Sequence, residues 1–338
     1  MKAIWYAGVD VSRRTLDVAL RNAAGTTAPT AQFENTAAGH SELVRWLTQR
    51  GRHGRVVLEA TGVYSLDLAL ALHAAPSVEV MVVNPRAARD FAKACLQRSS
   101  TDATMAVALQ EFAARMKFVP WAPPALEVRQ LRASARRLAA LTVEMARERN
   151  RVHAGGATAD TPAVVLNDIA VNVRHLTRRI VERERQAQAL IAATPALQRA
   201  HTRLVSIRGI ALTSAIQLLG ELLVLPTAMT PRQWVAHSGL DVRQVTSGTS
   251  VHKTPRISKQ GNAHVRRALY MPALVAARYE PHVRAFYEQL LARGKTKLQA
   301  LVAVMRKLLH AIWGMLKTDT DFDGAKFRKL PTLLPQAA

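Results

Sequence analysis

The chain has 338 residues, a hydrophobic content of 49% and a formal net charge of +23 at pH 7. This length accommodates two domains and a connecting element, and the basic excess favours a nucleic-acid partner over a neutral small-molecule substrate. The single cysteine, Cys95, excludes an internal disulfide and a cysteine-based zinc site and fits a reducing cytoplasm, the compartment in which we expect the protein to act.

An anionic membrane surface is the competing partner for a chain of this charge. No uninterrupted apolar run is long enough to span a bilayer, and no signal peptide is recognisable, so we expect no membrane association. Aromatic residues make up only 5% of the chain, which indicates that base stacking on aromatic side chains is not the main mode of binding.

The first part of the chain predicts strands that alternate with helices. Apolar runs bounded by turn residues predict strands at residues 3–11, 16–20, 30–34, 55–58 and 78–83. Ser41 is expected to cap a helix that begins S-E-L-V-R-W-L. This alternation indicates an α/β domain with a partly parallel sheet.

Three carboxylates stand where these elements end or begin. Asp10 ends the first strand, Glu59 ends the strand at 55–58, and Asp102 begins a helix. Carboxylates at strand ends face the crevice in which α/β sheets bind ligands, and a cluster of them is unfavourable unless a divalent cation neutralises it. The pattern therefore predicts Mg²⁺. Each residue also has a structural interpretation, with Asp10 as a turn former and Asp102 as a helix N-cap, although Glu59 is harder to explain in this way.

A proline-rich joint at 119–124 precedes two long charged helices. Leu131, Leu138, Met145 and Val152 recur every seven residues, and after Gly155-Gly156 a 3–4 apolar spacing runs from 166 to 190. Such narrow apolar stripes indicate a coiled coil or an antiparallel hairpin, and self-association of this element is a route to a dimer. Arginines decorate these helices at 147, 149, 151, 174, 178, 179, 183 and 185. They form either a solvated face or, as we favour, a strip that holds a nucleic-acid backbone.

The C-terminal part, opened by Thr194-Pro195, predicts helices. Residues 204–219 resemble a helix-hairpin-helix, although Ala211 stands where a second glycine is usual. Thr230-Pro231 begins another helix, and longer ones are expected through Leu290 and over 296–316. The tail beyond Asp321 is expected to be weakly ordered.

Between these helices lies a basic stretch without carboxylates, from Arg243 to Pro272. It opens with the hydroxyl turn S-G-T-S at 247–250, and no acidic residue occurs between Asp241 and Glu280. Such a turn suits a polyanion whose phosphates approach a serine oxygen, and the alternative is a hairpin on a solvated basic face. The candidate nucleic-acid contacts are Arg243, Lys253, Arg256, Lys259, Arg266, Arg267 and, in the glycine turn, Arg208.

Several short motifs occur in a fixed order along nearly the whole chain. They are G-V-D-V-S (8–12), L-E-A-T-G (58–62), V-N-P (83–85), S-T-D (100–102), V-S-I-R-G-I (205–210), W-V-A-H-S-G-L (234–240), S-G-T-S-V (247–251) and R-I-S-K-Q-G-N with R-R-A-L-Y-M-P (256–272). The ordered set resembles the DEDD-type transposases of the insertion-sequence-110 family, which include the Piv-like DNA invertases.

This resemblance implies a RuvC-like (RNase H-like) domain at 1–124, a coiled-coil connector at 125–193, a mostly helical transposase domain at 194–320 and a tail at 321–338. It implies that Asp10, Glu59 and Asp102 are three of four acidic Mg²⁺ ligands and that Ser247 attacks DNA to form a transient serine–DNA bond. It further implies that protomers of a homo-oligomer, a dimer or tetramer, share composite sites. A structured bridge RNA would pair with double-stranded donor and target DNA.

The sequence departs from the family pattern at the fourth acidic position, where Met105 stands. A thioether is a poor ligand for Mg²⁺, and Glu111 lies about half a turn round the helix from Asp102, so we expect no substitute from it. Two alternatives therefore remain beside the recombinase. One is a scaffold that binds RNA and DNA without chemistry, and the other is a RuvC-like junction nuclease that hydrolyses DNA with water.

Overall fold

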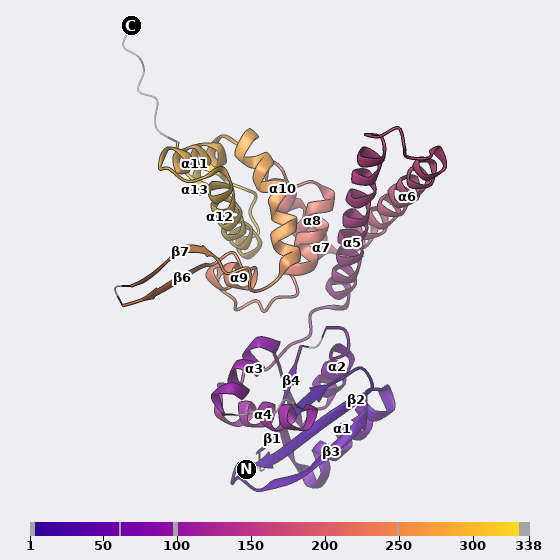
Figure 1. Ribbon diagram of the computed structural model, residues 1–338. Coiled ribbons are helices and arrows are strands. Elements are labelled where there is room, and N and C mark those ends of the chain that lie inside the picture. The colour runs from indigo at the N-terminus through magenta and orange to yellow at the C-terminus, as the bar shows by residue number, and fades with distance from the viewer. Residues whose placement is uncertain (1–3, 61, 97–100, 249, 331–338) are drawn as a thin grey trace. The chain divides into compact units, whose positions relative to one another are not determined.

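The computed structural model describes residues 4–60, 62–96, 101–248 and 250–330, without the side chain of Lys253. The chain divides into an N-terminal unit, Met1–Pro123, and a C-terminal unit, Pro124–Ala338 (Figure 1). In these described ranges no helix combines the length and the apolar character that a bilayer crossing requires.

A five-stranded mixed sheet forms the centre of the N-terminal unit, in the order β3-β2-β1-β4-β5. Its strands are β1 (Ile4–Val11), β2 (Thr15–Asn22), β3 (Thr27–Glu34), β4 (His53–Glu59) and β5 (Val78–Val83). The first three are antiparallel neighbours, whereas β1, β4 and β5 run parallel. The predicted α/β character with a partly parallel sheet is confirmed.

Helices cover both faces of this sheet because the strand residues alternate between two apolar clusters. Ala7 and Val9 pack with Leu43 of α1 (Ala37–Thr48) and Leu68 of α2 (Leu66–Ala74). On the other face Val57 packs with α3 (Pro85–Ala94) and α4 (Asp102–Arg115). A short 3₁₀ turn, Gln49–Gly51, leads from α1 into β4.

The predicted cap of α1 is wrong. The helix begins at Ala37, and the side chain of Thr36 accepts the hydrogen bond from the backbone N–H of Gly39. Ser41 lies inside the helix, where its hydroxyl donates to the carbonyl of Ala37 at 3.0 Å. Thr36 is therefore the cap, because it is the residue at which the chain leaves the extended conformation that follows β3.

Gly8 of β1 allows α4 to pack directly on the strand. A Cβ atom added to Gly8 would lie 2.1 Å from the carbonyl oxygen of Ala106 and 2.2 Å from the backbone nitrogen of Gln110. Any side chain here would therefore force the helix away from the sheet. The close approach fixes the path of α4 across the strand that carries Asp10.

Two long helices, α5 (Leu126–Gly155) and α6 (Ala163–Ala193), form a helical hairpin in the C-terminal unit (Figure 1). Leu141 and Met145 of α5 pack against Leu176 of α6. Of the heptad positions, Leu131, Leu138 and Met145 are buried, whereas Val152 is exposed near the hairpin turn. The first half of α5 belongs to the main core of the unit, where Leu131 and Leu138 are buried with Leu219 of α8.

The rest of this unit is a helical body with one β-ribbon (Figure 1). Its elements are α7 (Pro195–Val205), α8 (Leu212–Leu222), α9 (Pro231–His237), β6 (Val242–Ser247), β7 (Val251–Ile257), α10 (Ala263–Tyr279), α11 (Pro281–Ala292), α12 (Lys297–Thr318) and α13 (Gly324–Phe327). The predicted start at Thr230 is confirmed, since its side chain accepts from the backbone N–H of Gln233. The helix expected through Leu290 is interrupted at Glu280-Pro281, where α10 ends and α11 begins.

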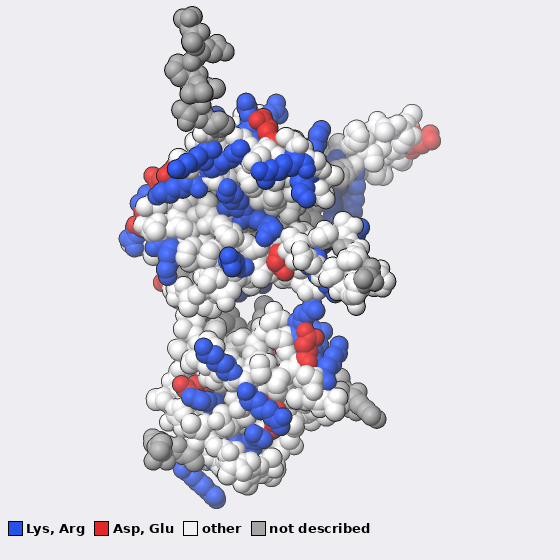
Figure 2. Space-filling view, turned by 90° about the vertical axis from the view of Figure 1, so that its left-hand side faces the viewer, with Lys and Arg blue, Asp and Glu red and all other residues white. Residues whose placement is uncertain are grey.

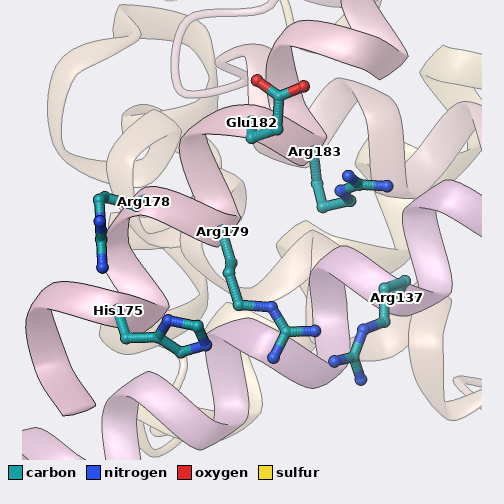
Figure 3. A pocket seen from close by; sticks show the side chains of 6 residues that line it. All are labelled: Arg137, His175, Arg178, Arg179, Glu182 and Arg183. Carbon is teal, nitrogen blue, oxygen red and sulfur yellow. The ribbon is translucent and has the colours of Figure 1, made fainter.

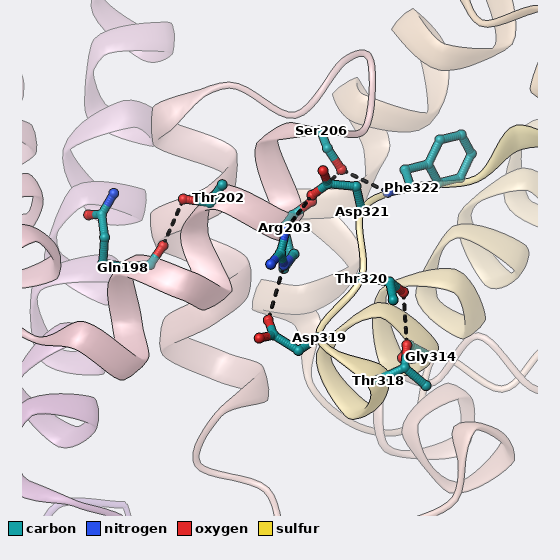
Figure 4. Close-up of polar contacts among 10 residues, drawn as sticks. All are labelled: Gln198, Thr202, Arg203, Ser206, Gly314, Thr318, Asp319, Thr320, Asp321 and Phe322. Atoms are coloured by element: carbon teal, nitrogen blue, oxygen red, sulfur yellow. Dashed lines mark hydrogen bonds and ion pairs between the residues drawn. The ribbon is translucent and has the colours of Figure 1, made fainter.

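The expectation of weak order beyond Asp321 is corrected for residues 321–330. Arg203 of α7 binds the carboxylates of Asp319 and Asp321 at 3.0 and 2.9 Å, and the backbone N–H of Phe322 donates to the hydroxyl of Ser206 (Figure 4). Phe327 of α13 is 4% exposed. These contacts join residues far apart in sequence. Local composition therefore did not predict that residues 321–330 pack on the helical body. Residues 331–338 lie outside the described ranges.

Candidate functional site

Sheet register places two of the predicted carboxylates side by side. Val9 of β1 pairs with Leu58 of the parallel strand β4, so Asp10 and Glu59 follow at the same edge of the sheet. By alternation both side chains belong to the face that α3 and α4 cover, the face of Gly8 and Val57. Parallel strands that end together bring their following residues to one crevice.

Asp102 reaches the same edge from α4. It is the first residue of the helix, and Thr101 before it is the N-cap, so the structural interpretation of Asp102 as a cap is wrong. The helix then crosses Gly8 with Ala106 and Gln110. Because the cap is supplied by Thr101, the exposed carboxylate of Asp102 is not needed to hold the helix end.

The negative charges of Asp102 and Glu59 act on the carboxyl group of Asp10. Burial, followed by the negative charges of Asp102 and Glu59 and then of Asp17, raises the pKa of Asp10 from 3.8 to about 6. Burial also raises the pKa of Glu59, and the positive charge of Arg89 opposes that rise. A carboxyl group whose pKa is raised by burial and by neighbouring negative charges lies in an environment that favours a cation.

The donor set suits a hard divalent cation such as Mg²⁺, because all three groups offer carboxylate oxygens. The side chains as they stand are not drawn together around one point, since the described residues contain no group of three or more His, Cys, Asp or Glu side chains that could hold a metal ion. The placement of the three carboxylates and the raised pKa of Asp10 therefore fit a cation, whereas the side-chain positions do not form a metal site.

Two charged residues of this neighbourhood were missed by the sequence analysis. Asp17 lies directly opposite Asp10 in the β1–β2 register and accepts a 3.1 Å hydrogen bond from Gln32. Arg89 on α3 lies close enough to Glu59 to lower its pKa. Asp17 could have been found from the hairpin signal, because Asp10 and Asp17 flank the same short turn, whereas the position of Arg89 depends on the packing of α3.

Met105, at the position where the resemblance predicts a fourth acidic residue, makes a packing contact. It lies one turn along α4 from Asp102 and is partly buried against the cluster that contains Val57 and Met81. We call the sheet edge at Asp10, Glu59 and Asp102 the acidic edge. Glu111, as expected, takes no part in it. Its carboxylate instead accepts from Arg21 at 2.7 Å and pairs with Arg115 at 2.6 Å.

Ser247 lies at the free end of the β6–β7 ribbon in the C-terminal unit. It is the last residue of β6, is exposed, and pairs with Val251 across the turn, in which Gly248 has a φ of +52°. Thr249 of the same turn lies outside the described residues. At the base, the hydroxyl of Ser258 donates to Asp241 at 2.5 Å, and Ile257 packs against the main core. The local interpretation as an exposed basic hairpin is confirmed.

Basic side chains follow the ribbon. Arg243 and Arg256 are directly opposite each other, a like-charge pair that is unfavourable unless an anion lies nearby. Lys253 pairs with Val245 in the register, but its side chain lies outside the described residues. Lys259, Arg267 and Arg208 are exposed, and the guanidinium of Arg208 lies 6.0 Å from the ring centroid of Tyr279.

Arg266 has a structural contact that the sequence did not indicate. Its guanidinium donates to the carbonyl of Ser238 at 2.7 Å, so it holds the end of α9 beside the N-terminus of α10. Figure 2 shows lysine and arginine side chains spread over the visible face of the C-terminal unit, with few acidic side chains between them. Such a face suits a polyanion rather than a neutral ligand.

Two family models and several known proteins are similar to this chain. A DEDD-type IS110 transposase model matches residues 7–155, and a model described as "Transposase IS116/IS110/IS902 family" matches residues 201–288. The chain is 29% identical to the pilin gene-inverting protein of Moraxella bovis and 28% to that of Moraxella lacunata, each over 94% of this chain and 97% of the relative.

A further relative is an uncharacterized 43.6 kDa protein of the insertion element IS110 from Streptomyces coelicolor, with 31% identity over 41% of this chain and 35% of the relative. The two family models lie on either side of the helix α6, one over the acidic edge and the other over the ribbon that carries Ser247. The chain therefore belongs to the IS110 family of transposases.

Proposed function

We propose that the protein is a DNA recombinase that cuts and rejoins donor and target DNA through a covalent bond to Ser247. The observation that supports this proposal is the acidic edge, where Asp10 and Glu59 follow paired strand ends, Asp102 begins α4, and the pKa of Asp10 rises to about 6. A fold has no structural use for such repulsion, whereas phosphoryl-transfer sites use it to hold a cation.

The chemistry requires no external energy source. The hydroxyl oxygen of Ser247 attacks a DNA phosphorus and loses its proton, and one phosphorus–oxygen bond to deoxyribose breaks as the serine–phosphorus bond forms. The departing DNA oxygen takes up a proton. In the second step the hydroxyl of another DNA strand attacks the same phosphorus and the serine leaves, so the number of phosphodiester bonds is conserved.

Asp10, Glu59 and Asp102 would hold Mg²⁺, which when bound neutralises charge on phosphate oxygens and favours loss of the hydroxyl proton. The exposed guanidinium groups of Arg243 and Arg256 hold the DNA backbone near the base of the ribbon, because a phosphate between them relieves their repulsion. These contacts position DNA without reading its sequence.

Finer features of the family complete the proposal. The strand order β3-β2-β1-β4-β5, with two antiparallel neighbours on one side of β1 and parallel strands on the other, supports a RuvC-like identity for the N-terminal unit. The α5–α6 hairpin supports a coiled-coil role in self-association into a dimer or tetramer. A structured bridge RNA would select donor and target by base pairing, since the basic side chains described above offer backbone contacts.

The test compares two serines of one turn. Ser247→Ala is expected to abolish recombination of a donor–target plasmid pair and the serine-linked DNA adduct. Ser250→Ala, which removes an exposed hydroxyl from the same turn, is expected to retain both. Full recombination by Ser247→Ala contradicts the proposal, and free 5′-phosphate ends without an adduct indicate hydrolysis by a junction nuclease instead.

A second candidate function rests on Met105. Because this thioether packs in an apolar cluster and supplies no charged ligand, the acidic edge lacks one carboxylate of the family pattern. This observation favours a scaffold that binds nucleic acid without chemistry. Absence of both recombination and the adduct in the unmodified chain, with DNA binding intact, would identify the scaffold.

A further inference from the structure

A second basic surface lies on the helical hairpin. Arg137 of α5 and four basic residues of α6 line one open hollow of about 570 Å³ (Figure 3). The four are His175, Arg178, Arg179 and Arg183, and the single acidic residue at the hollow is Glu182. We call these residues, without Glu182, the hairpin patch. The patch joins side chains from two helices, and it adds Arg137 and His175 to three arginines of the strip that the sequence predicts.

The spacing on α6 gives the patch its direction. His175, Arg179 and Arg183 are four residues apart, so they lie in one row along the helix. At about 1.5 Å per residue this row covers about 12 Å. Arg179 and Arg183 extend from α6 toward α5, and Arg137 extends from α5 beside them (Figure 3). The row is long enough to follow roughly three phosphates of one strand, at about 3.4 Å each along a duplex axis.

The guanidinium groups of the patch have little counter-charge among the described residues, where only Arg183 acts electrostatically on the carboxylate of Glu182. The carboxylate of Glu182 is already bound by Arg185 at 3.0 and 3.1 Å and also accepts from Gln186. Figure 3 shows this carboxylate directed away from the guanidinium groups of Arg137 and Arg179. Among the described residues no ion pair involves Arg137, Arg178, Arg179 or Arg183. Neighbouring guanidinium groups without a counter-charge repel one another, so an external polyanion stabilises the patch.

We propose that the hairpin patch binds the phosphodiester backbone of double-stranded DNA, as a second DNA contact distinct from the ribbon that carries Ser247. The choice of DNA rests on the proposed function. The contact is independent of sequence, because guanidinium groups on a helix face meet phosphates and not base edges. Planar guanidinium groups also bind phosphate with two parallel hydrogen bonds, which explains the use of arginine here instead of lysine.

The test measures binding of a fluorescein-labelled DNA duplex to the full chain by anisotropy at several salt concentrations. The variant R137Q/R179Q removes two charges from the patch, and the control R45Q/R199Q removes two exposed charges on α1 and α7, outside the hollow. We expect the patch variant to bind about tenfold more weakly and to lower the slope of log affinity against log salt by about 2. The control should change neither value appreciably.

Two further measurements make the result decisive. R137K/R179K, which keeps the charge, should recover most of the salt slope, and thermal unfolding should show that all variants remain folded. Equal weakening by both glutamine variants, or none by either, overturns the proposal. Loss of binding to a labelled RNA duplex with DNA binding intact also overturns it. Binding requires no strand transfer, so this assay separates the hairpin patch from the chemistry of Ser247.

Discussion

The carboxylate of Glu221 accepts a 2.7 Å hydrogen bond from the side-chain amide of Asn262, the N-cap residue of α10. The same carboxylate, 1% exposed, binds Arg136 of α5 at 2.6 Å and lies 3.5 Å from Arg132. Burial alone would raise the pKa of Glu221, but hydrogen bonds from Arg136 and Asn262 and the charge of Arg132 hold it below its ordinary value. One buried group therefore joins the helical hairpin, α8 and the segment that follows the ribbon.

Glu221→Gln is expected to lower the free energy of unfolding by about 2–3 kcal/mol, because the buried carboxylate that binds Arg132, Arg136 and Asn262 is replaced by a neutral amide. The pKa of Glu221 is depressed in the folded state, so this stability is present above the unfolded value of 4.5 and is lost as pH falls through the folded pKa. Urea unfolding at neutral and acidic pH measures both effects. Glu144→Gln on α5 is the control, and a change as small as the control's would show that Glu221 is not a structural anchor.

Asp10→Asn is expected to stabilise the chain at pH 7.5 in the absence of divalent cations. The folded pKa of Asp10 is about 6 against 3.8, so between these values the folded state holds a proton that the unfolded state has lost. Stability therefore falls as pH rises through this window, by roughly 1–2 kcal/mol after allowance for solvent screening. Urea unfolding of parent and variant from pH 4 to 7.5 should show a gap that opens with pH. A gap that is constant with pH would contradict the electrostatic cluster.

Gly8→Ala should separate α4 from β1, since its Cβ would lie 2.1 Å from a backbone oxygen. Gly54→Ala on the neighbouring strand β4 is a matched control, because the nearest atoms to its Cβ are side-chain methyl groups at 3.9 Å. We expect Gly8→Ala to lower the free energy of unfolding by about 3 kcal/mol and Gly54→Ala by less than about 1 kcal/mol. Thermal unfolding compares the two, and similar values would show that α4 does not depend on the close approach.

Met105→Asp tests whether the acidic edge lacks a ligand. Without Mg²⁺ the new carboxylate should destabilise the chain by about 1–3 kcal/mol, since the site is partly apolar and already acidic. With Mg²⁺ at ten times its Kd, binding to the folded state alone should return about 1.4 kcal/mol and raise Tm. Recombination should increase as well. Met105→Asn, equal in size but uncharged, is the control, and identical behaviour of the two variants would leave the scaffold function as the better explanation.

Local sequence patterns predicted the strands of the sheet, but they did not predict the cap of α1 or the burial of Phe327. Residues 78–83 were predicted as a strand with its observed bounds, because a β-branched run stopped by Asn84-Pro85 leaves no helical alternative. The cap of α1 was assigned to Ser41 and not Thr36, since both precede apolar residues and only the end of β3 distinguishes them. Burial of Phe327 depends on Phe286 and Phe322, which no local signal connects.

The same division holds for the candidate site. Asp10 and Glu59 could be placed at one edge because strand ends are visible in the sequence and parallel strands end together. The contribution of Asp17 required the hairpin register, and that of Arg89 required the packing of α3. Arg266 is a predicted nucleic-acid contact, and its additional hydrogen bond to the carbonyl of Ser238 depends on the packing of α9 beside α10. Residue type predicted the chemistry of these positions, and tertiary contacts decided their use.

Among its described residues, the ribbon that carries Ser247 contacts the helical body at its base, through Ile257 and the Ser258–Asp241 hydrogen bond. A pair of strands without a third strand or a helix along it is marginally stable in water. Contact with substrate therefore supplies much of the rigidity of its tip, and the conformational freedom lost there weakens loosely seated complexes most. In the function proposed above, the serine at this tip would therefore react only when DNA is correctly bound, which would limit the cleavage of other DNA.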